Sequence, residues 1–229
     1  MSWWSRWFGK PSPEPPSPVE DPPAVGWQAI VAAFTSHYGD QDPQHWAPDV
    51  YRMNDLSDDA AAFDGISAYA ADGFWHLVSF GLTELYRKEA GNDPHVSGFG
   101  YELTLKIPRI GDTPPAWARQ VLEGIGKQVW KGLALGHGHT IQTGPIDGRA
   151  DTPLDAMLVV RDPAFPEPLD TPHGRVELLL LVGVTSEERQ AVTAVRDDPD
   201  AIAGLLQERY ADNPEQITPL RSQGPFGGA

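Results

Sequence analysis

The residues best suited to chemistry stand in one short stretch, GHGHTIQTGPIDGRAD. His137 and His139 are two positions apart, so on a strand both imidazoles would point to the same face. With Asp147 in the loop that follows, they could hold a metal ion or carry out acid–base hydrolysis. No HExxH helix or other metal-ligand spacing accompanies them, and a structural or solvated pair fits the pattern better. A metal-dependent or acid–base hydrolase that uses these three residues is therefore kept as the alternative function. The main expectation is a protein without a metal or cofactor.

A second stretch, HVSGFGYELTLKIP, places two glycines around Phe99. A dinucleotide-type phosphate loop needs a third glycine and a helix directly after it. Here the alternation of apolar with polar or glycine residues predicts a strand, with one apolar face and one polar face. The apolar positions, expected to face the core, are Phe99, Tyr101, Leu103, Leu105 and Ile107. Glycines at the mouth of a strand indicate a bulge or the close approach of another backbone.

The remaining periodicities predict a mixture of helices and strands. One amphipathic helix should begin near Val25 and end at Gly39, and a longer one should carry Trp130 on its core-facing stripe. Helix N-caps are expected at Thr113, Thr185 and Asp198. Further strands are expected within 65–85, 155–163 and 175–184. Because helices and strands do not alternate regularly, we expect an α+β domain whose mixed central β-sheet is flanked by helices.

The charge balance is strongly acidic, with 32 Asp and Glu against 17 Lys and Arg and a formal net charge of −15. Nucleic-acid binding relies on many Lys and Arg contacts with phosphates, so no nucleic-acid role is expected. An acidic surface favours a basic partner, although solubility alone would also account for the charge. The chain has no cysteine, which excludes disulfides and thiolate zinc sites and favours a reducing, cytoplasmic location.

The two ends of the chain differ in composition from its middle. Residues 1–24 are expected to be disordered, because they contain seven of the 23 prolines. The head of this segment carries Trp3, Trp4 and Trp7, which could touch a membrane surface or a partner. It is too short to span a membrane. We expect a folded domain over residues 25–221 and a disordered tail over residues 222–229.

Seven blocks follow one another along roughly residues 25–190: GWQAIVAAFTSHYGDQDPQHWAP, FDGISAY, WHLVSFGLTELYRKE, SGFGYELTLKIPR, PPAWARQVLEGIGKQVW, GHGHTIQTGPID and DTPHGRVELLLLVGVTSEE. In this order they resemble the suppressor-of-fused family, and specifically its amino-terminal domain. The resemblance implies a compact α+β binding module without catalytic residues. Animal members of the family hold a zinc-finger transcription factor by clamping an extended peptide as a strand between two domains. Single-domain bacterial members resemble immunity proteins that neutralise toxins.

The resemblance also implies where a partner would bind. The peptide-facing region of the animal members matches Asp93 and Tyr86 in this sequence. On physical grounds, a strand mouth at Phe99 flanked by Glu84 and Glu102 would suit an extended, basic peptide. We therefore predict a non-enzymatic domain, resembling a bacterial immunity or antitoxin protein. It would bind and mask a basic, toxin-like protein partner by β-strand addition.

Overall fold

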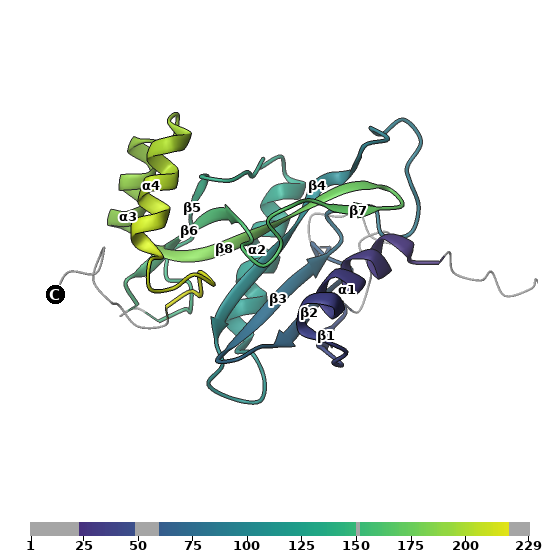
Figure 1. Cartoon of the computed structure of the whole chain (residues 1–229), viewed down its shortest axis with the longest axis horizontal. Helices are drawn as coiled ribbons and strands as arrows, with labels where there is room; N and C mark the ends of the chain where they lie inside the picture. The colour runs from purple at the N-terminus through teal and green to yellow at the C-terminus, as the bar shows by residue number, and fades with distance from the viewer. Residues whose placement is uncertain (1–22, 49–59, 150–151, 220–229) are drawn as a thin grey trace, which may run out of the picture.

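A computed structural model describes residues 23–48, 60–149 and 152–219, and Figure 1 shows their arrangement. The disorder predicted for the N-terminal segment and for the C-terminal tail concerns residues that lie almost wholly outside the described ones. The described residues form an eight-stranded sheet with helices on both faces.

The sheet is mixed, because one central pair of strands is parallel and the others are antiparallel. The strands are β1 (Gln44–Trp46), β2 (Gly65–Ala70), β3 (Phe74–Phe80), β4 (Val96–Pro108), β5 (Thr140–Gln142), β6 (Leu154–Arg161), β7 (Leu169–Thr171) and β8 (Gly174–Thr185). Their order is β1-β2-β3-β4-β8-β6-β5, and β7 pairs with β8 outside this path. The parallel pair is β4 with β8. This arrangement confirms the predicted α+β class with a mixed central sheet.

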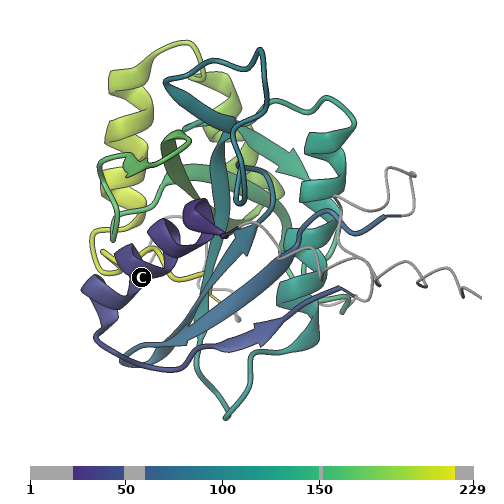
Figure 2. The ribbon, with the colours of Figure 1, turned by 90° about the vertical axis from the view of Figure 1, so that its right-hand side faces the viewer.

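Helices cover both faces of this sheet (Figure 2). They are α1 (Val25–Tyr38), α2 (Ala116–Trp130), α3 (Ser186–Ala194) and α4 (Pro199–Arg209). The helix α2 packs on the face formed by residues such as Leu103, Leu105 and Leu181. The helices α1, α3 and α4 lie on the opposite face, α1 toward one end and α3 with α4 toward the other. No helix among the described residues is both long and apolar enough to cross a membrane.

Most helix boundaries follow from local chemistry. Gly39 ends α1 with a φ of 80°, which favours glycine. Thr185 and Glu188 form the expected capping box of α3, and Asp198 caps α4. The predicted cap at Thr113 is wrong. Two prolines separate Thr113 from the first turn, so Pro115 precedes α2 without any side-chain cap.

The polar face of β4 is as deeply buried as its apolar face, which corrects the expectation of a two-sided strand. Glu102, Thr104 and Lys106 have no exposed surface, because β4 lies at the centre of a sheet covered on both sides. Glu102 accepts from neutral donors, whereas Lys106 is ion-paired with two carboxylates, one of them that of Glu215 at 2.9 Å. Lys106 Nζ lies 3.1 Å from one oxygen of Asp162, and His76 Nε2 lies 2.8 Å from the other. We call these four polar residues (His76, Thr104, Lys106 and Asp162) the Asp162 cluster.

Candidate partner-binding site

A hollow of about 580 Å³ is lined by residues of the loop between β3 and β4, of the start of β4 and of the end of α2. Its lining residues are Leu82, Thr83, Glu84, Glu89, Asn92, Asp93, Val96, Gly98, Phe99 and Trp130. Three residues of the predicted site, Glu84, Asp93 and Phe99, are thus brought together. The rim carries carboxylates, and no lysine or arginine is among the described residues that line it. We name it the Phe99–Trp130 hollow.

Two exposed aromatic side chains form one wall of the hollow. Phe99 is 41% exposed and Trp130 is 37% exposed, and their rings meet edge to face with centroids 4.9 Å apart. The indole of Trp130 is oriented by a hydrogen bond that its Nε1–H donates to the Ala62 carbonyl at 2.9 Å. Both residues were expected in the core, and both expectations are wrong. Exposed aromatic side chains of this kind are common anchors of protein interfaces.

Phe99 points outward because the two glycines beside it interrupt the strand. Gly98 has a φ of 54° and Gly100 a φ of 87°, and the register of β4 with β8 shifts between Val96 and Tyr101. The Phe99 N–H donates to the Leu82 carbonyl at 2.9 Å. This confirms the interpretation of the glycines as a bulge at which another backbone comes close.

Replacing Gly98 with alanine should lower the free energy of unfolding by about 2 to 4 kcal/mol. A Cβ there would lie 2.4 Å from the Leu82 carbonyl oxygen, so backbone must move. The matched control is Gly144→Ala, which has a similar φ of 71° but no neighbour within 4 Å. Urea unfolding of the two variants compares them directly. Equal losses would show that the close approach contributes nothing.

Glu84 fastens the loop between β3 and β4. Its carboxylate accepts hydrogen bonds from Lys88 Nζ at 2.7 Å, the Glu89 N–H at 2.8 Å and Asn92 Nδ2 at 2.9 Å. It also accepts one from the Gly98 N–H at 3.2 Å. Burial alone would raise the pKa of the Glu84 carboxyl, but the Lys88 ammonium and the other donors lower it. Glu84 therefore shapes the hollow, and its charge is already balanced by Lys88.

Glu102 lies beneath the hollow and does not face a partner, which corrects its predicted role. It has no exposed surface, and its carboxylate accepts from the Ser79 hydroxyl at 2.6 Å and the Thr83 hydroxyl at 2.8 Å. It also accepts from the backbone N–H groups of Gly81, Leu82 and Thr83. Leu82 and Thr83 line the hollow, so the buried carboxylate holds the turn from which one wall is built.

Burial raises the pKa of Glu102 to about 7, although the donors from Ser79 and the turn favour its charged form. The folded chain therefore binds a proton more tightly than the unfolded chain. The stabilisation that follows is present below pH 4.5 and is lost as the pH rises through 7. Relative to Glu102→Gln, the wild-type free energy of unfolding should fall by about 2 kcal/mol between pH 5 and pH 7.5. Urea unfolding at both values measures this, and a constant difference would contradict it.

The other two predicted residues lie in different surroundings. Asp93 is exposed on the rim, where its Oδ1 accepts from the His95 N–H at 2.8 Å. Tyr86 is half-buried and packs on the apolar cluster under α1, and it does not line the hollow. Its place in a partner site stays a prediction.

The residues of the alternative hydrolase site are not brought together. His137 and His139 lie in a loop, not on a strand, and line a cavity of about 430 Å³ beside β5. Asp147 lines a different cavity and pairs with Arg149 at 2.7 Å. Within the described ranges there is no group of three His, Asp or Glu side chains that could hold a metal ion.

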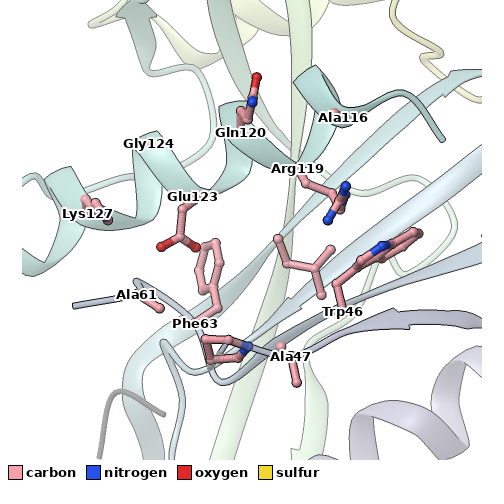
Figure 3. A pocket seen from close by; sticks show the side chains of 13 residues that line it. Trp46, Ala47, Ala61, Phe63, Ala116, Arg119, Gln120, Glu123, Gly124 and Lys127 are labelled. Carbon is pink, nitrogen blue, oxygen red and sulfur yellow. The ribbon is translucent and has the colours of Figure 1, made fainter. Parts of the chain in front are cut away.

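Sequence reasoning missed a second hollow of about 530 Å³, between α2 and the strands β1 and β2 (Figure 3). The Arg119 guanidinium lies 4.5 Å from the ring centre of Trp46, and Glu123 accepts the Ala62 N–H. The only sequence signal was the isolated aromatic Trp46. The lining of this second hollow includes two cations and a carboxylate, so it has no single charge preference. The charged residues known to line the Phe99–Trp130 hollow are carboxylates.

The fold and the hollow define a mixed-sheet α+β domain with a surface suited to binding a partner. The family model described as Suppressor of fused protein (SUFU) matches residues 59–221. The chain belongs to the suppressor-of-fused family, as its sequence blocks predicted.

Its relatives include large animal proteins. The human Suppressor of fused homolog is 34% identical over a 157-residue alignment that covers 64% of this chain and 31% of that protein. The mouse homolog matches with the same identity and coverage. The chain therefore spans about a third of the length of the curated relatives that it matches.

Solved structures share the fold. A chain in the Sufu–Fu complex crystal structure has a TM-score of 0.76 at 26% identity, with coverage of 89% of this chain and 93% of that one. Drosophila Suppressor of Fused also has a TM-score of 0.76, at 25% identity, with coverage of 89% and 52%. A SUFU homolog from Neisseria gonorrhoeae has a TM-score of 0.51 at 12% identity, with coverage of 86% and 94%, and this shows a shared fold alone.

Proposed function

We propose that this chain is a non-enzymatic protein-interaction domain that binds an extended, basic segment of a protein partner in the Phe99–Trp130 hollow. The observation that carries the proposal is an exposed aromatic pair in a hollow whose charged lining residues, among those that the structure describes, are all carboxylates. Aromatic anchors supply affinity through buried apolar area, and the carboxylates select cationic side chains. One related structure is of a complex between Sufu and another protein, Fu, which supports a protein partner for this chain too.

The finer proposal is that the chain acts in the cytoplasm as an immunity or antitoxin-like protein that masks a toxin-like partner. The net charge of −15 supports capture of a basic partner. The peptide would bind extended and pair through its main chain, as in strand addition.

Affinity capture from the native host tests this, with the full chain immobilised. The wild type should enrich one stoichiometric basic protein, and Phe99→Ala should bind that protein about 30-fold more weakly, as expected for an interface anchor. Ile110→Ala is the matched control, because Ile110 is 81% exposed and lines a different cavity. Failure to enrich a partner, or equal binding by Phe99→Ala, would argue against the proposed function.

A further inference from the structure

The described chain begins beside the Phe99–Trp130 hollow. The Gly26 N–H, in the first turn of α1, donates to the Leu85 carbonyl at 2.8 Å. A Cβ on Gly26 would lie 2.3 Å from the carbonyl oxygen of Glu84, which lines the hollow. In Figure 1 the start of α1 lies close to the loop that connects β3 and β4. The two described residues that precede α1, Pro23 and Ala24, therefore lie next to the wall of this site.

Residues 1–10, called the head below, have side chains that suit the hollow. They contain Trp3, Trp4, Trp7 and Phe8 together with Arg6 and Lys10, and no aspartate or glutamate. The hollow offers aromatic rings that can pack edge to face with an indole. Of its three lining carboxylates, Glu84 is paired with Lys88 and Glu89 with Arg87, so Asp93 on the rim is the group that attracts the two cations. Between the head and the domain, the connecting residues carry Glu14, Glu20 and Asp21. These acidic residues would be repelled by the rim, so the attraction is confined to the head.

The connection is long enough for the head to return to the hollow. Residues 11–22 would span about 37 Å as a polyproline helix and roughly 20 Å on average as a flexible coil. Either length lets the head reach the hollow, because the connection ends near Gly26, which lies directly against Glu84 of the hollow's lining.

We propose that residues 1–10 dock into the Phe99–Trp130 hollow of their own chain and compete there with the partner. The proposal rests on the proposed function for the identity of the site. A short tether gives the head an effective concentration of about 1 mM. A head that binds with a Kd of about 0.1 mM would then occupy the hollow in about 90% of molecules and weaken partner binding about tenfold. The head thus raises the partner concentration needed to fill half of the hollows about tenfold.

Distance measurement between spin labels tests the docking without any partner. The chain has no cysteine, so labels can be attached at introduced cysteines alone. Ser5→Cys places one label in the head, and Ala90→Cys places the other at an exposed position in the loop beside the hollow. Ser5→Cys with Ala203→Cys, exposed on α4, is the matched distant pair. We expect a narrow, short distribution for the first pair and a longer one for the second.

Two changes should broaden the first distribution: Phe99→Ala in the hollow, and Trp3, Trp4 and Trp7→Ala in the head. Ile110→Ala should leave it narrow. An Ala90–Ala203 label pair checks that Phe99→Ala keeps the fold. A broad distribution in the wild type, or a narrow one that survives both changes, would overturn the proposal. So would a short distance that arises only on mixing singly labelled chains, which would mean binding between copies. Broad distances with tryptophan-dependent sedimentation on phosphatidylglycerol vesicles would mean membrane contact instead.

A second measurement separates the two proposals. A labelled synthetic peptide of residues 1–10 should bind the full chain carrying Trp3, Trp4 and Trp7→Ala about tenfold more tightly than it binds the wild type, whose own head competes. Equal binding to both chains would overturn head docking. If partner capture still depends on Phe99, the proposed function survives that result. If the head docks but no partner is captured, only the proposed function fails.

Discussion

Replacing Asp162 with asparagine is expected to lower the free energy of unfolding by about 3 to 5 kcal/mol, because it removes one member of a buried charge cluster. Asp162 and Lys106 have no exposed side-chain surface and lie 3.1 Å apart. The Asp162 carboxylate also accepts from the Thr104 hydroxyl at 2.6 Å and from the Ala164 N–H at 3.0 Å. The substitution leaves the buried Lys106 ammonium with the partly exposed carboxylate of Glu215, 2.9 Å away, as its counter-charge.

The protonation states within the Asp162 cluster follow from its geometry. Burial alone would raise the pKa of Asp162, but the His76 ring and the Lys106 charge lower it well below its ordinary value. Burial lowers the pKa of His76, so its ring is neutral, with Nε2–H donating to Asp162 and Nδ1 accepting from the Tyr38 hydroxyl. Since the folded pKa of Asp162 is depressed, its stabilisation is present above about pH 4 and is lost as the pH falls further.

Urea unfolding at pH 7 measures the loss. Asp170→Asn, at an exposed position in β7, is the matched control and should change the free energy of unfolding by less than about 0.5 kcal/mol. The double variant Asp162→Asn with Lys106→Met should recover part of the loss, because it removes a buried cation that the partly exposed Glu215, 2.9 Å away, compensates only in part. If Asp162→Asn is as stable as the control, the cluster contributes nothing to stability.

Replacing Glu102 with alanine should lower the free energy of unfolding by a similar amount, about 3 to 5 kcal/mol at pH 5. Five donors would lose their acceptor: two hydroxyls, from Ser79 and Thr83, and the three backbone N–H groups of residues 81–83. Since this turn lines the Phe99–Trp130 hollow, its amide hydrogens should also exchange faster with solvent. Urea unfolding and hydrogen exchange together measure both effects.

Two companion variants interpret the result at Glu102. Glu102→Gln keeps an oxygen that faces the turn amides and should lose less than half as much stability as Glu102→Ala. Glu208→Ala, at an exposed position in α4, should be close to neutral. Unchanged exchange of the turn amides in Glu102→Ala would contradict the assigned role, whatever the change in global stability.

Local signals in the sequence predicted most of the architecture. The helix that ends at Gly39, the long alternating strand and the capping box at Thr185 all depend on neighbours within a few residues, and the structure confirms them. The mixed sheet could also be expected, because irregular ordering of helices and strands excludes a doubly wound fold.

The details of the site could not be predicted in this way, because they depend on contacts between distant residues. Trp130 follows the apolar stripe of its helix, yet it ends beside Phe99, whose direction is set by the bulge at Gly98. Glu102 appeared as a surface charge of an alternating strand. Its burial depends on a turn that leaves β3 about twenty residues earlier and points three N–H groups at it.

The parallel pairing of β4 with β8 has a consequence for how the chain folds as it is synthesised. β4 is complete at Pro108, but its partner β8 ends only at Thr185. At typical rates of about 5 to 20 residues per second, the ribosome needs roughly 4 to 15 s to supply β8. During that interval the edge of β4 that later pairs with β8 has unpaired backbone N–H and C=O groups, and such an edge can pair with other chains. The nascent chain should therefore depend on chaperones most strongly in the interval between these two strands.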